Sequence, residues 1–100
     1  MATRESIEID FQQAMSQADR IDGIASQLSN LSNNKFGGSL QQLAGGWKGD
    51  NAKAYIGKGN ALKSNINQSA NELREIANAI REAARRIYAA EMAAIDIVNS

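Results

Sequence analysis

The sequence predicts an all-α protein, an antiparallel helix-turn-helix hairpin that dimerises into a four-helix bundle. The chain has 100 residues and no proline, and residues that favour helices, such as Ala, Leu, Glu, Gln and Arg, are abundant. Apolar residues recur in both halves at alternating steps of four and three, a spacing typical of packed helices. Glycines gather between the halves, where a turn is expected. We therefore expect a single helical-hairpin domain over residues 1–100.

The first helix is expected at about residues 6–44. Its apolar positions run without a break through Ile7, Phe11, Ala14, Ala18, Ile21, Ala25 and Leu28. The pattern then slips by a residue and resumes at Phe36. Poor helix formers collect in the same place, and Gly37 and Gly38 each cost about 1 kcal/mol inside a helix. We expect one long helix, bent or weakened near 33–38, rather than two separate helices.

A turn is expected at residues 45–50, before a second helix at about 51–95. Gly45 and Gly46 are suited to ending the first helix, and Asp50 is suited to capping the second. The second helix has its own unbroken apolar pattern through Tyr55, Gly59, Leu62, Ile66, Ser69, Leu73, Ile76, Ile80, Ala83, Ile87 and Ala90.

A small-residue flank lies beside this pattern, at Ala70, Ala77 and Ala84. Small side chains let helices approach closely, so this flank is expected to admit a helix of another chain. A lone hairpin buries only one stripe per helix, which favours a dimer. The seam of hairpin and dimer is predicted at Ile21, Leu28, Leu62, Ile66, Leu73, Ile76 and Ile80.

Composition argues against several classes of function. Basic and acidic residues balance at eleven each, so no net charge draws the chain to nucleic acid or to an anionic membrane. Without histidine or cysteine, the usual pairs of nucleophile and base cannot be built. Glu91 and Asp96 lie about 140° apart on a helix, which disfavours a metal site. No catalytic residue, cofactor or metal is predicted, and no stretch is apolar enough for stable membrane insertion.

Trp47, Lys48 and Gly49 stand between the two expected helices, near the middle of the chain. A small residue follows at Ala54 and an aromatic residue at Tyr55, in the stretch WKGDNAKAY. In these features the chain resembles the WXG family of small type VII secretion substrates, the relatives of the early secretory antigenic target. The resemblance implies a non-enzymatic bacterial protein. The N-terminal stretch MATRESIEIDF has no signal-peptide pattern, so export without a leader is expected.

Two compatible roles are expected for Trp47. Its indole can fold back over the helix ends, where glycines leave room, because large aromatic side chains commonly anchor cores. The resemblance implies a second role, in which the turn motif, Trp47 and Gly49, forms part of a surface that the secretion machinery recognises.

The C-terminal segment is a candidate for export and docking. Family members often carry a tyrosine followed four residues later by an acidic residue, but Tyr88 is followed at that spacing by Met92. A looser pattern of hydrophobic and acidic positions is met by Ile87, Glu91, Ala94 and Val98. Together with Tyr88, these residues either complete the apolar pattern of the second helix or dock on the secretion ATPase.

The leading hypothesis is a small protein secreted by a type VII system that acts through protein–protein interaction. Its expected partners are itself, as a homodimer, or a related small helical protein, and the secretion ATPase. The alternative is a cytosolic adaptor that pairs with the helical N-terminal domain of a larger secreted toxin. A structural coiled coil without an export role is also open, and Trp47 would then only plug the turn.

Overall fold

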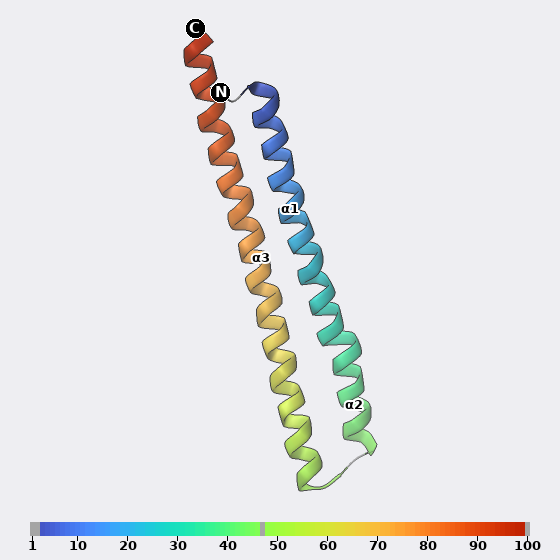
Figure 1. The fold of residues 1–100 in the computed structure, drawn as a ribbon. Coiled ribbons are helices and arrows are strands. Elements are labelled where there is room, and N and C mark those ends of the chain that lie inside the picture. Colours follow the sequence, from blue (N-terminus) through green and yellow to red (C-terminus); the bar gives the residue numbers. More distant parts are fainter. Residues whose placement is uncertain (1–2, 47, 100) are drawn as a thin grey trace. The chain divides into compact units, whose positions relative to one another are not determined.

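The computed structural model describes residues 3–46 and 48–99, which form a helical hairpin (Figure 1). The first arm consists of α1 (Arg4–Asn30), the π-helix η1 (Leu31–Phe36) and α2 (Gly37–Gly46). The second arm is α3 (Asp50–Asn99). The described ranges contain no strand, and the predicted all-α helix-turn-helix class is confirmed.

The hairpin divides into two compact units, and each contains a stretch of both arms. We call residues 1–22 with 74–100 the terminal unit, and residues 23–73 the turn unit. In the terminal unit, the rings of Phe11 and Tyr88 pack with their centroids 4.9 Å apart. In the turn unit, the Ser32 hydroxyl donates a hydrogen bond of 3.0 Å to the backbone carbonyl of Lys63. Each unit therefore has its own contacts between the arms.

α1 begins with a reciprocal cap. The Ser6 backbone N–H donates to Thr3 Oγ1 at 3.0 Å, and the Thr3 backbone N–H donates to Ser6 Oγ at 2.9 Å. The first N–H groups of a helix have no partner inside it, so these bonds satisfy donors that would otherwise need water. The start of α1 is thereby fixed by its own side chains.

The π-helix explains the slip in the apolar pattern of the first arm. A π-helix holds one more residue in a turn than an α-helix, so the step of eight from Leu28 to Phe36 leaves both side chains half-buried. The backbone stays helical into Gly37, where φ is −61° and ψ is −40°. The irregularity that the sequence places near 33–38 is thus an extra residue within a continuous helix.

The buried line of α3 differs from the line that the sequence favoured. Ala70 and Ala77 are 0% exposed and Ala84 is 8% exposed, whereas Leu62 and Ile76 are 51% and 50% exposed. The expectation that the alanine flank is open to another chain is therefore wrong. Small side chains permit close approach of helices, and here they are used within the chain itself.

The other residues of the predicted seam lie at the edge of this buried line. Five of them have intermediate exposure: Ile21, Leu28, Ile66, Leu73 and Ile80. With Leu62 and Ile76 exposed, the seam lies partly at solvent in the single chain. The part that these residues play in a dimer stays a prediction.

Candidate functional site

The turn takes its shape from the glycine of the Trp-x-Gly motif. Gly49 has φ of +116°, the only positive φ in the part of the chain that the structure describes. The Lys53 backbone N–H donates to the Gly49 carbonyl at 3.1 Å, which joins Gly49 to the first turn of α3. Trp47 lies outside the described residues, so both of its expected roles stay predictions.

A hollow next to the turn combines small and apolar residues with two lysines. It has a volume of about 610 Å³ and is lined by Ala44, Lys48, Gly49, Lys53, Ile56, Gly57 and Asn60. On α3, the Lys58 ammonium lies 5.7 Å from the centroid of the Tyr55 ring, within the range of a cation–π contact. The turn region is therefore basic as well as glycine-rich.

The structure places the C-terminal docking segment on α3 in the terminal unit and divides it between two hollows. Ile87 and Tyr88 line a small hollow of about 130 Å³ together with Phe11. Ala94 and Val98 line a larger one of about 630 Å³. Glu91 borders both hollows. The segment is thus not one uniform surface, because its Tyr88 end is engaged by α1 and its Val98 end is open.

We call the larger hollow the terminal groove. It lies between the first residues of α1 and the last turns of α3, and it is lined by Thr3, Arg4, Glu5, Ile7, Glu91, Ala94, Ile95, Val98 and Asn99. Ile7 is 2% exposed and forms a fixed apolar floor, whereas Val98 is 67% exposed. The groove therefore offers an apolar surface that the chain itself leaves partly uncovered.

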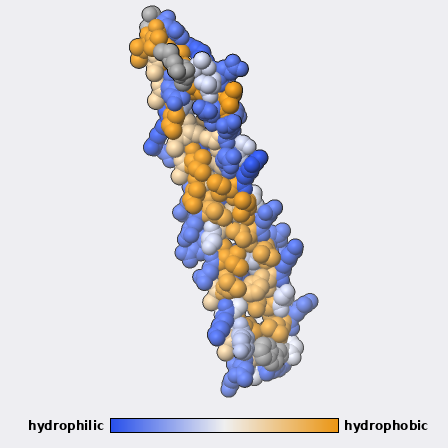
Figure 2. Space-filling view, in the orientation of Figure 1, coloured by the Kyte–Doolittle hydropathy of each residue, from blue (hydrophilic) through white to orange (hydrophobic). Residues whose placement is uncertain are grey.

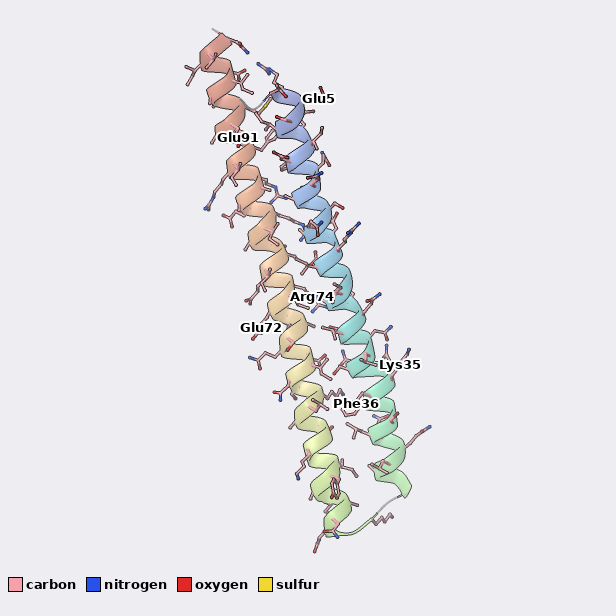
Figure 3. All side chains as sticks on the ribbon, in the orientation of Figure 1. Glu5, Lys35, Phe36, Glu72, Arg74 and Glu91 are labelled. Carbon is pink, nitrogen blue, oxygen red and sulfur yellow. The ribbon has the colours of Figure 1, made fainter. Side chains whose placement is uncertain are left out.

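Only some of the charged side chains around the terminal groove form salt bridges. Arg4 pairs with Asp96 through a hydrogen-bonded salt bridge. Glu5 and Glu91, one on each arm, form no salt bridge within the described residues (Figure 3). The rim of the groove therefore keeps negative charge after its arginine is neutralised.

Arg81 joins the arms of the terminal unit at a second place. Its guanidinium donates to Asp19 at 2.7 Å and to Asp22 at 2.6 Å, and its side chain is 16% exposed. The hydrogen bonds to Asp19 and then Asp22 raise the pKa of Arg81 above its ordinary value. Sequence reasoning missed this contact because the partners are 62 and 59 residues away. The available signal was the pair of aspartates three residues apart on one side of a helix.

Exposed apolar side chains occur in both units (Figure 2). Those of the turn unit are Ile24, Leu31, Leu43, Tyr55 and Leu62, and those of the terminal unit are Ile9, Ile76, Ile87, Ile97 and Val98. In the turn unit, Ile24 and Leu31 are seven residues apart, as are Tyr55 and Leu62, so each pair lies on one side of its helix. These are surfaces that a helical partner can cover.

The described residues contain no group of three or more His, Cys, Asp or Glu side chains that could hold a metal ion. None of the helices in these ranges is long and apolar enough to cross a membrane.

Comparison with known proteins gives one match. The model of the WXG100 family, proteins of 100 residues with WXG, matches residues 6–92. The match covers both arms and the turn, and it stops before Ala94 and Val98 of the docking segment. No curated protein and no solved structure matches the chain.

Proposed function

We propose a function for this chain on the ground that it belongs to the WXG100 family. The resemblance drawn from the Trp47–Gly49 turn is thereby confirmed. Members are small helical proteins associated with type VII secretion in bacteria and are in general non-enzymatic. For this chain we propose export by a type VII system and action through protein–protein contacts.

The first proposed contact is with a second copy of the chain. The terminal unit carries six basic and nine acidic residues, a net charge of −3, and the turn unit carries five basic and two acidic residues, a net charge of +3. Because opposite charges attract, the terminal unit of one copy is favoured next to the turn unit of another copy, whereas contact between like units is unfavourable. The charge distribution therefore supports a homodimer that completes a four-helix bundle.

The second proposed contact is with the secretion ATPase, through the end of α3. The observation that carries it is the exposure of Ile97 and Val98, which at 74% and 67% exceed the other exposed large apolar residues. An apolar helix end that stays in water is unfavourable unless a partner covers it. Tyr88 is already packed against Phe11, so we assign docking to the residues after it.

A truncation tests the docking role without removing the Tyr88 contact. The chain shortened after Met92 keeps Phe11, Tyr88 and Glu91, and it should stay helical by circular dichroism. We expect it to accumulate in the cell lysate instead of the culture medium, with a cytosolic marker as the control for lysis. Normal export of the shortened chain would show that this segment is not the docking site.

The adaptor role is a second candidate, because the exposed side chains of the turn unit, such as Ile24 and Leu62, would also fit a helical domain of a larger protein. In that case a toxin with a helical N-terminal domain takes the place of the second copy. Purification from the source cell distinguishes the two roles. A stoichiometric larger partner favours the adaptor, and the chain alone as a dimer favours the homotypic bundle.

A further inference from the structure

We propose that the terminal groove binds a basic amphipathic helix of a partner protein. The proposal deepens the docking role of the α3 end and rests on it, since it states which chemistry the partner must present at that site. It also places α1 in the site, so the docking surface includes residues from both arms.

The shape of the groove favours apolar anchors. Ile7, Ala94, Ile95 and Val98 provide its apolar lining, and the volume of about 630 Å³ is open on one side. An amphipathic helix can insert side chains spaced three and four residues apart into such a groove while its polar face stays in water. Ile97, exposed next to Val98, extends the apolar surface beyond the groove itself.

The negative charge at the rim of the groove favours a positively charged partner. Glu5 and Glu91 line the groove without a salt bridge in the described part of the chain, and Arg4 is neutralised by Asp96. A lysine or arginine beside the apolar anchors would pair with these carboxylates. An acidic helix would be repelled, which disfavours the end of α3 from a second copy, since it carries Glu91 and Asp96.

The charges at the two helix ends beside the groove also favour a basic partner. The described last turn of α3 contains no basic residue, and the partial negative charge of a helix C-terminus attracts cations. The Thr3 and Ser6 N–H groups at the start of α1 are already bonded to side chains, and Glu5 lies in its first turn. A cationic side chain is therefore favoured at the end of α3, and an anionic side chain would meet the Glu5 carboxylate at the start of α1.

Direct binding to the full-length protein tests the proposal. The probe is a synthetic amphipathic peptide of about 18 residues with leucine on one face and lysine on the other, compared with a counterpart in which glutamate replaces lysine. Fluorescence anisotropy should show binding of the lysine peptide that weakens as salt is raised. The glutamate peptide should bind at least about tenfold more weakly.

Paired variants locate the site. Glu5→Gln with Glu91→Gln should weaken the lysine peptide about fivefold, whereas Glu8→Gln with Glu75→Gln, which changes the net charge equally at exposed positions outside the groove, should have little effect. Val98→Ser should weaken binding about tenfold. Ile9→Ser, an exposed isoleucine that does not line the groove, is its control. Circular dichroism establishes that each variant is folded.

Several outcomes would overturn the proposal. They are equal binding of the two peptides, equal effects of the groove variants and their controls, or displacement of the lysine peptide when a second copy fills the groove at high protein concentration. This test is independent of export. If truncation after Met92 blocks export but the peptide does not bind, the groove proposal fails and the proposed function stands. If the peptide binds but truncation after Met92 leaves export unaffected, the docking role fails instead.

Discussion

At the scale of single residues, Gly49 shows why the turn motif contains glycine. The sequence suggested Gly45 and Gly46 as the glycines that end the first helix, and α2 does end at Gly46. Yet the positive φ of the described turn falls on Gly49, three residues later. A side chain is strained at such a φ, whereas glycine is not. The spacing of glycines in the sequence does not reveal which of them takes the strained conformation.

Replacing Gly49 tests this assignment. Gly49→Ala should lower the free energy of unfolding by about 1–2 kcal/mol, because alanine must adopt a disfavoured backbone conformation. Gly46→Ala is the matched control, since its added methyl group would meet no atom within 4 Å and its φ is not positive. Urea denaturation of both variants provides the comparison. Equal stabilities of the two variants would mean that the backbone conformation at residue 49 does not require glycine.

A second prediction for a single residue concerns the contribution of Arg81 to thermal stability. Arg81→Gln should lower the thermal midpoint more than Arg86→Gln does, because Arg81 bonds to two aspartates across the arms while Arg86 pairs only with Glu82 along its own helix. The pKa of Arg81 is raised in the folded protein, so the bridge stabilises the fold fully at any pH below the pKa of this arginine in the unfolded chain. This stabilisation is lost only in strong alkali.

The effect of Arg81→Gln on the thermal midpoint should therefore be the same at about pH 7 and about pH 9. Raised salt should reduce that effect, as for any partly exposed ion pair. Equal midpoints for the Arg81 and Arg86 variants would show that the inter-arm bridge does not stabilise the terminal unit.

At the scale of helices, periodicity predicted the presence of both arms but not which stripe of α3 faces the first arm. Two neighbouring heptad stripes were available, one rich in isoleucine and leucine and one made of alanines. Hydropathy favours burying the larger residues, but close packing of two helices favours the smaller ones, and Ala70 and Ala77 are fully buried. Which stripe is buried depends on the shape of the partner helix, and the periodicity of α3 alone holds no information about that partner.

Enlarging a buried alanine tests the packing register. Ala77→Leu should destabilise the chain by about 1–3 kcal/mol, because Ala77 is fully buried and a larger side chain there forces the packed helices to shift. Ala79→Leu, at an exposed position two residues away, should leave stability nearly unchanged. Chemical denaturation measures both. If the two variants were equally stable, the alanine line would not be the contact between the arms.

At the scale of the whole molecule, the neutral total charge can be read from the sequence, but the division of that charge cannot. The opposite net charges of the two units appear only when residues are grouped by contact. The WXG motif carried the family assignment, and the fold it implies is the one observed. The terminal groove was not predictable, because Ile7 and Glu5 meet the end of α3 only through the pairing of the arms.

The dimer can be tested through the seam residues that remain exposed. Leu62→Ser should shift the protein toward the monomer in sedimentation equilibrium while leaving its helical content unchanged, since this side chain is half exposed in the single chain. Ile9→Ser, which is not part of the predicted seam, should leave the association unchanged. Raised salt should also weaken the dimer, because the units that attract each other carry opposite net charges. A Leu62→Ser protein that dimerises as tightly as the parent would exclude this surface from the interface.

Export by a type VII system is tested by the distribution of the protein between culture medium and cell lysate. The measurement is made in the source bacterium with and without the secretion ATPase, with a cytosolic marker as the control for lysis. We expect the protein to accumulate in the medium and this accumulation to disappear without the ATPase. Retention in the cytosol in both strains, or export that persists without the ATPase, would contradict this expectation.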